Sequence, residues 1–108
     1  SMDYNAFEFT ESASNDLDET LNYIKNTLCN DVAASDFYNK VLETINTICK
    51  FPFSMPIVQN EFLSREDIRK TVVKNFILYY CFQENKSKIT VLRIVYGKRN
   101  MNEILKTI

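Results

Sequence analysis

The run FILYYCF, at residues 76–82, carries the strongest β-strand signal in the chain. Seven consecutive residues of this apolar and aromatic kind are typical of a strand that is covered on both faces. Residues 68–73 precede it across the two-residue link Lys74-Asn75, in which Asn75 can adopt a positive φ. Residues 89–96 follow it after a polar turn. The three segments therefore predict an antiparallel meander with residues 76–82 in the middle.

The last of these strands carries a charged residue among apolar ones. Strict alternation along residues 89–96 places three side chains on one face, Leu92, Ile94 and Tyr96. It places three others on the opposite face, Val91, Arg93 and Val95. A lone cation between valines is unfavourable without a partner. Glu84 is the only acid between Ile68 and Arg99, so we expect Arg93 to bind an anion from outside the chain. The alternative is a half-buried arginine that pairs with an acid at the sheet edge.

Two amphipathic helices are predicted ahead of the meander. The apolar stripe of the first repeats at spacings of four, three and four residues, at Leu17, Leu21, Ile24 and Leu28. The second stripe consists of Phe37, Val41, Ile45 and Ile48. The short link Cys29-Asn30-Asp31 favours an antiparallel helical hairpin. Neither helix can bury its stripe alone, so the hairpin is expected to cover one face of the sheet.

The remaining segments complete an α+β fold with the order β-α-α-β-β-β-α. Residues 5–10 read as a short strand, residues 57–66 as a loop and residues 100–106 as a short helix. Phe51-Pro52 ends the second helix, and the aromatic residues there form either a lid on the core or a patch for a partner. We expect a single domain over residues 1–108 and an antiparallel sheet. Its second face should stay partly open and carry cations.

Composition indicates an ordinary soluble globular protein. The 108 residues are 45% hydrophobic and 25% charged. No apolar run approaches the length of a membrane span and no secretory signal is visible, so we expect a cytoplasmic protein without a membrane partner. The three cysteines have neither disulfide nor zinc spacing, and we expect reduced thiols and no metal site.

Basic and acidic residues are distributed unevenly along the chain. Residues 1–54 hold three Lys or Arg against nine Asp or Glu, a net charge of −6, whereas residues 55–108 hold ten against five, a net charge of +5. Within residues 68–99, eight basic residues accompany the single acid Glu84. Such asymmetry indicates a surface that binds something acidic. The alternative is a solvated sheet rim whose lysines protect exposed strand edges.

Several short motifs, taken in order, resemble those of the RelE/ParE toxin superfamily. They are ASNDL at 13–17, AASDF at 33–37, FP at 51–52, IRK at 68–70, VVKNFILYY at 72–80, VLRIVYGKR at 91–99 and IL at 104–105. Each motif is weak by itself, but their order and spacing cover nearly the whole chain. The final Ile104-Leu105 is similar to ParE-like sequences, whereas RelE-like nucleases commonly place a Tyr or His there.

The resemblance implies the toxin of a type II toxin–antitoxin system, which arrests growth when free of its antitoxin. It implies a cognate antitoxin as partner, operator DNA bound only through that antitoxin, and no cofactor. An antitoxin carboxylate then becomes a second candidate partner for Arg93. In this superfamily ParE-like members inhibit DNA gyrase, whereas RelE-like members cleave mRNA on the ribosome. A third reading is an inactive or regulatory module that keeps only antitoxin binding.

The residues themselves favour binding over catalysis. Cleavage of RNA needs a base, an acid and a fixed cation at the phosphate. The chain has no His, and Tyr96 shares a face with core residues, so only the cation is readily supplied. The candidates for a catalytic cation are Arg69, Arg93 and Arg99. The wider set expected to bind the target or its phosphates is Arg69, Lys70, Lys74, Arg93, Lys98 and Arg99.

Overall fold

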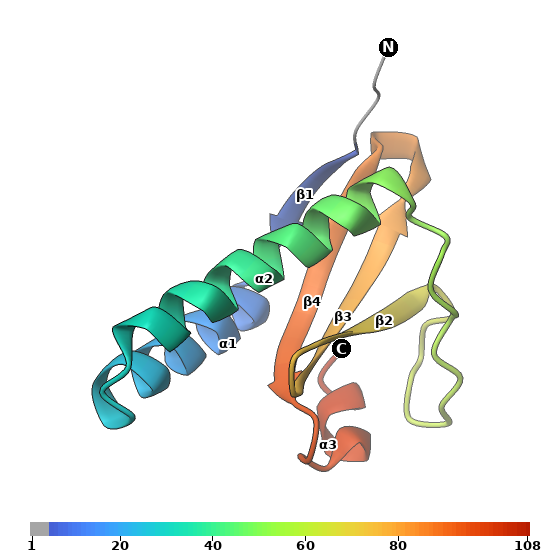
Figure 1. The fold of residues 1–108 in the computed structure, drawn as a ribbon. Coiled ribbons are helices and arrows are strands. Elements are labelled where there is room, and N and C mark those ends of the chain that lie inside the picture. The colour runs from blue at the N-terminus through green and yellow to red at the C-terminus, as the bar shows by residue number, and fades with distance from the viewer. Residues whose placement is uncertain (1–4) are drawn as a thin grey trace.

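The computed structural model describes residues 5–108 and confirms the predicted α+β order (Figure 1). The first half holds β1 (Ala6–Phe9), α1 (Glu11–Asn22), the π-helical turn η1 (Tyr23–Thr27) and α2 (Asp31–Lys50). The second half holds β2 (Ile68–Val73), β3 (Phe76–Gln83), the short 3-10 turn η2 (Glu84–Lys86), β4 (Lys88–Tyr96) and α3 (Met101–Leu105). Residues 57–66 contain no helix or strand, as expected for a loop.

The four strands form one sheet in the order β1-β4-β3-β2. The expected meander is present, since β2, β3 and β4 pair antiparallel in sequence order. The expectation of a purely antiparallel sheet is wrong, because β1 pairs parallel to β4, with Ala6 opposite Lys88 and Phe9 opposite Val91. The helical hairpin explains this difference. It forms the long crossover between β1 and the meander that a parallel neighbour requires.

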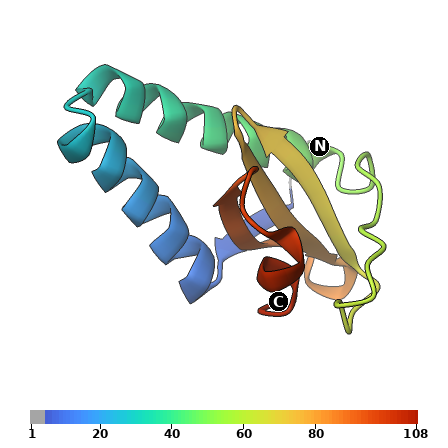
Figure 2. The ribbon, with the colours of Figure 1, turned by 90° about the horizontal axis from the view of Figure 1, so that it is seen from below.

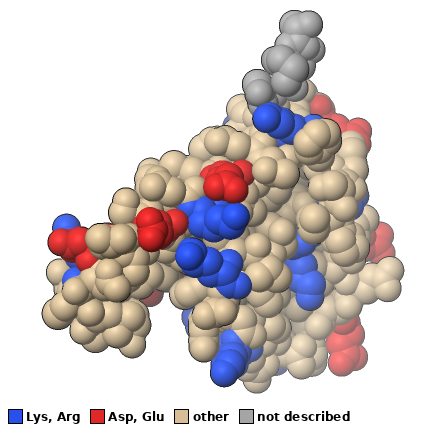
Figure 3. Space-filling model, in the orientation of Figure 1, with Lys and Arg blue, Asp and Glu red and all other residues tan. Residues whose placement is uncertain are grey.

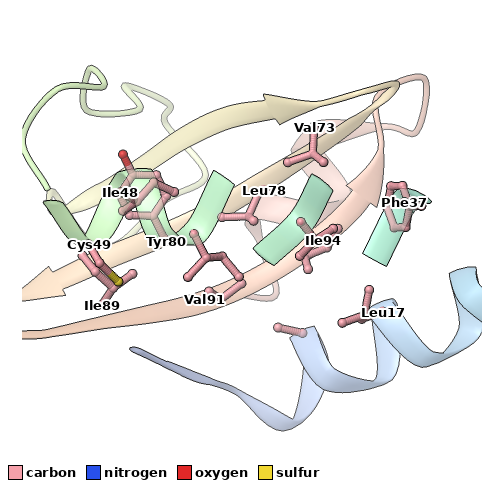
Figure 4. Packing of buried hydrophobic residues seen from close by; sticks show 13 residues of the cluster. Leu17, Phe37, Ile48, Cys49, Val73, Leu78, Tyr80, Ile89, Val91 and Ile94 are labelled. Carbon is pink, nitrogen blue, oxygen red and sulfur yellow. The ribbon is translucent and has the colours of Figure 1, made fainter. Parts of the chain in front are cut away.

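The helical hairpin packs on one face of the sheet, as predicted. Figure 4 shows the core between them, in which side chains of α2 meet those of β3 and β4. All four members of the second predicted stripe are buried, Phe37, Val41, Ile45 and Ile48. Figure 2 shows the tip of the hairpin extending beyond the edge of the sheet. The tip therefore has no sheet beneath it.

Leu28, the last residue of the first predicted apolar stripe, is not buried. Leu28 is 55% exposed, although the spacing placed it in line with the buried Leu17. The reason is the π-helical turn, in which the Leu28 N–H donates to the carbonyl oxygen of Tyr23 at 3.0 Å. Each π turn holds more residues than an α turn, so it rotates the residues that follow around the helix axis.

A β-bulge in β4 changes which side chains face which way. Tyr79 pairs with Arg93 but Tyr80 pairs with Val91, so Leu92 is the extra residue. Val91 consequently shares the helix-side core with Ile94, while Leu92 lies in the core of the other face. The strict alternation predicted for residues 89–96 is therefore wrong beyond Val91.

The second face of the sheet is covered over most of its area, although Lys70 and Val72 of β2 remain exposed there. Residues from β2, β3, β4 and α3 form its core, namely Ile68, Tyr79, Cys81, Leu92, Val95, Ile104 and Leu105. Val58 and Leu63 of the loop pack against them. The expected partly open cationic face is thus wrong over most of the sheet, where the short helix and the loop supply apolar side chains that the sequence pattern did not assign to it, and Lys70 is the predicted site cation that we find exposed on this face of the described sheet.

The cysteines of the described chain are all free. Cys29 is exposed at the hairpin tip, whereas Cys49 and Cys81 are buried on opposite faces of the sheet. Burial raises the pKa of the Cys49 thiol. Within residues 5–108, no helix combines the length and hydropathy that a membrane crossing needs.

Thr10 joins the start of α1 to β4, and its loss should destabilise the protein. Its hydroxyl oxygen accepts from the N–H of Ala13 at 3.1 Å, and its hydroxyl donates to the carbonyl of Leu92 at 2.9 Å. We expect Thr10→Ala to lower the free energy of unfolding by about 1–2 kcal/mol, because one helix N–H loses its cap. Urea denaturation measures this change. Thr10→Ser is the control and should retain most of the stability.

Candidate functional site

Three cations come together at one end of the sheet, where the β2–β3 turn meets the turn after β4. The Gly97 N–H donates to the carbonyl oxygen of Asn75 at 2.8 Å and so joins the two turns. Lys74, Lys98 and Arg99 are exposed there, and none takes part in the ion pairs found within residues 5–108. We call these three residues the cationic end.

Local backbone geometry holds the two turns together. Lys74 has a φ of 54°, so the left-handed residue of the β2–β3 link is Lys74 and the prediction of Asn75 was wrong. A Cβ atom on Gly97 would lie 3.1 Å from the Asn75 carbonyl oxygen, which makes a larger residue unfavourable at this contact. Asn100 then caps α3 by accepting from the N–H groups of Asn102 and Glu103. The chain that carries Lys98 and Arg99 is thus attached at both ends.

An aromatic surface adjoins the cationic end. Tyr96 is 41% exposed, and its ring contacts that of Phe76 edge to face at 5.7 Å between centroids. Phe76 in turn contacts Phe37 of α2. The expectation that Tyr96 belongs to the core is therefore wrong. An exposed ring beside cations can contact either a protein side chain or a nucleobase.

A groove of about 280 Å³ separates the hairpin tip from the β2–β3 turn, beside the cationic end. Its lining is mainly apolar and consists of Ile24, Leu28, Ala33, Asp36, Phe37, Lys74, Asn75 and Phe76. Lys74 belongs to both the groove and the cationic end, so one ligand could contact the two together.

Arg93 lies outside this site because an acid of the same chain binds it. Its Nε and Nη2 donate to the two carboxylate oxygens of Asp16, at 2.7 and 3.0 Å, and its Nη1 donates to the Thr107 hydroxyl oxygen at 2.8 Å. The side chains of Arg93 and Asp16 are only 14% and 12% exposed. Hydrogen bonds to Asp16 raise the pKa of Arg93. The expectation of an external anion at Arg93 is therefore wrong, and the family-like segment 13–17 supplies its partner.

The other two predicted cations lie apart from the cationic end and from each other. Arg69 faces the helix side of β2, where one of its terminal N–H groups donates to the Met55 carbonyl and its guanidinium lies 5.2 Å from the Phe53 ring centre. Lys70 points to the opposite face and is exposed. The six predicted residues therefore do not form one surface. Figure 3 shows basic side chains below α2 and down to the lower end of the molecule, where the two turns lie.

Comparison with protein families matches residues 7–101 to the ParE toxin of type II toxin-antitoxin system, parDE. The chain belongs to the ParE toxin family. It is thus the toxin component of a type II toxin–antitoxin system, within the RelE/ParE superfamily that its motifs resemble. No curated protein matches this toxin.

Solved structures of toxin–antitoxin systems share the fold of this toxin. The chromosomal ParDE system of P. aeruginosa aligns with a TM-score of 0.68 at 16% identity, over 86% of this chain and 96% of that one. The RelBE2 complex of Mycobacterium tuberculosis aligns with a TM-score of 0.62 at 14% identity, over 87% of this chain and 99% of that one. The archaeal RelE–RelB complex of Pyrococcus horikoshii OT3 aligns with a TM-score of 0.57 at 11% identity, over 91% of this chain and 100% of that one.

The site of this ParE family toxin offers few groups for proton transfer. Ile104 and Leu105 are buried in the core where RelE-like nucleases commonly carry a Tyr or His. Tyr79 and Tyr80 are buried on opposite faces, and Glu103 pairs with Lys106 at 3.1 Å. Tyr96, at the end of β4 that leads into the cationic end, is exposed and is therefore the candidate proton donor among Tyr79, Tyr80 and Tyr96. Within residues 5–108, no group of three or more His, Cys, Asp or Glu residues could hold a metal ion.

Proposed function

We propose that the free toxin arrests growth by binding DNA gyrase in the cytoplasm, without performing covalent chemistry. The observation that carries this proposal is the cationic end, where Lys74, Lys98 and Arg99 are exposed and have no carboxylate partner in the described chain. Such cations favour an acidic macromolecular surface and speed its association. The neighbouring apolar groove supports a protein target, since protein contacts combine apolar centres with charged rims.

We further propose that the antitoxin neutralises the toxin by covering this region. Membership of the family supports a cognate antitoxin as partner, and the similar solved structures are themselves toxin–antitoxin systems. A partner bound over the groove and the cationic end would exclude the target sterically. Contact with operator DNA would then occur through the antitoxin.

A second candidate activity is cleavage of mRNA on the ribosome, which one observation favours. Tyr96 is 41% exposed and precedes Lys98 and Arg99 by two and three residues, so its hydroxyl belongs to the same end of the sheet as the two cations. The tyrosine could exchange a proton while a guanidinium stabilises charge on the phosphate. The site lacks an evident second group for proton transfer, which makes this candidate the weaker one.

Production of the toxin without an antitoxin separates these activities. We expect growth arrest with DNA breakage, intact transcripts, and inhibition of purified gyrase by purified toxin. Tyr96→Phe removes only the hydroxyl and should keep the arrest. Transcripts cleaved by the original chain but spared by Tyr96→Phe would establish the nuclease instead. Absence of arrest would favour a module that only binds antitoxin.

A further inference from the structure

Arg69 is a partly buried guanidinium without a carboxylate partner. The ion pairs of the described chain do not include it. Its Nη1 donates a hydrogen bond to the Met55 carbonyl, and its guanidinium lies near the Phe53 ring. A guanidinium carries five N–H donors in a planar fork that matches a carboxylate. Most of the donor capacity of Arg69 is therefore available to another molecule.

Tyr80 places a second unused donor beside Arg69. The two residues are direct cross-strand neighbours on β2 and β3, so their side chains lie on the same face of the sheet. Tyr80 is fully buried, and its hydroxyl has no hydrogen-bond partner. In Figure 4 it lies toward the end of the core where Ile48 and Cys49 are labelled. Burial raises the pKa of Tyr80, and the nearby Arg69 charge partly offsets this rise.

We propose that Arg69 and Tyr80 together form a receptor for one carboxylate of the antitoxin. The carboxylate would take the open N–H groups of Arg69. Because the Tyr80 hydroxyl has no exposed surface in the free toxin, it would donate a third hydrogen bond to the carboxylate only after binding displaces the side chains that cover it. An unpartnered buried hydroxyl is unfavourable, so the ligand would satisfy a group that the free toxin leaves unpaired. The inference rests on the proposed function for the identity of the partner, whereas the binding of an anion can be tested without it.

The surroundings of Arg69 favour an acidic protein side chain over nucleic acid. Phe53 is 56% exposed and Ile57 is 43% exposed, and Ile57 pairs with Arg69 through an isolated β-bridge. A nucleic-acid backbone is bound by several cations that follow its phosphates. The other basic residues of β2 and its turn do not lie beside Arg69, since Lys70 faces the opposite side of β2 and Lys74 lies at the far end of that strand. A guanidinium with an apolar rim suits an Asp or Glu flanked by apolar residues.

Titration of the full-length toxin with two simple monoanions tests the proposal. Acetate represents a carboxylate and dimethyl phosphate a phosphodiester, each added in place of chloride at constant ionic strength. The measurement is the NMR signal of the Arg69 Nε–H group. We expect acetate to produce a saturable shift and to bind more tightly than dimethyl phosphate. Tyr80→Phe should weaken acetate binding about tenfold, the effect of one hydrogen bond to a charged group.

Tyr79→Phe is the matched control, because its hydroxyl contacts the Met101 sulfur on the other face of the sheet. It should leave acetate binding unchanged. Equal acetate affinity in Tyr80→Phe and the original chain would overturn the receptor, as would the absence of a saturable shift. Tighter binding of dimethyl phosphate would overturn the carboxylate assignment in favour of nucleic acid. Growth arrest without antitoxin is measured separately, so failure of this inference leaves the proposed activity intact.

Discussion

Replacing Asp16 with alanine is expected to lower the free energy of unfolding by about 3–5 kcal/mol, the usual result of leaving one partner of a buried ion pair uncompensated. Asp16 binds both Nε and Nη2 of Arg93, and it also accepts from the Ile94 backbone N–H at 3.0 Å. Alanine would therefore leave the charge of a largely buried guanidinium uncompensated, with its Nε and Nη2 donors and a strand N–H without an acceptor. Urea denaturation, followed by circular dichroism, gives the difference.

Two further variants show whether the charge pair is the cause. Asp16→Asn keeps an oxygen for the Ile94 N–H, so it should cost less than alanine. Glu103→Gln breaks an exposed pair, with Glu103 at 65% and Lys106 at 47% exposure, and should change stability by less than about 1 kcal/mol. If Asp16→Ala were no more destabilising than Glu103→Gln, the pair between α1 and β4 would contribute nothing beyond a surface contact.

Reversing charge at the cationic end is expected to abolish growth arrest. In Lys98→Glu with Arg99→Glu, like charges would face an acidic target, which costs several kcal/mol and weakens binding about hundredfold or more. Both residues are exposed, so the fold should be retained. The measurements are growth after induction without antitoxin and inhibition of purified gyrase.

The control for this experiment reverses two cations elsewhere. Lys25 lies in η1 of the helical hairpin. Lys86 lies in η2, which follows β3 at the end of that strand away from the cationic end. Both lysines are exposed. Lys25→Glu with Lys86→Glu makes the same change in net charge and should retain the arrest. Equal loss of arrest in the two double variants would show that overall charge, and not the cationic end, governs the activity.

The order of elements could be predicted from the sequence because apolar spacing is a local property. The apolar run at residues 76–82 predicted a strand, whose middle residues 78–81 are buried as expected. The spacing of Phe37, Val41, Ile45 and Ile48 predicted a helical stripe, and all four are buried. The parallel pairing of β1 with β4 has no such local signal, since any sheet edge offers the same backbone groups. The π turn and the bulge each add a residue to a regular repeat, and they displaced the assignments of Leu28 and Leu92.

The sequence predicted which kinds of residue occur at the site better than it predicted where their side chains lie in three dimensions. The sequence identified the basic residues, but the partner of Arg93 lies 77 residues away on α1. The ASNDL segment was the available signal, because its acid lies between two residues, Ala13 and Leu17, that pack into the core. Tyr80 had no signal, since an unpaired hydroxyl depends on what surrounds it in three dimensions.

The parallel pairing of β1 with β4 has a consequence for the order in which the toxin can be made and folded. The link from Thr10 to Leu92 joins residues 82 positions apart, and β1 can dock only beside a finished β4. Folding during synthesis proceeds from the N-terminal side. β1 therefore stays unpaired until the hairpin and the other three strands have emerged from the ribosome. A nascent chain that has not yet reached Lys88 therefore cannot close its sheet, and a translation arrest before that residue yields no folded toxin.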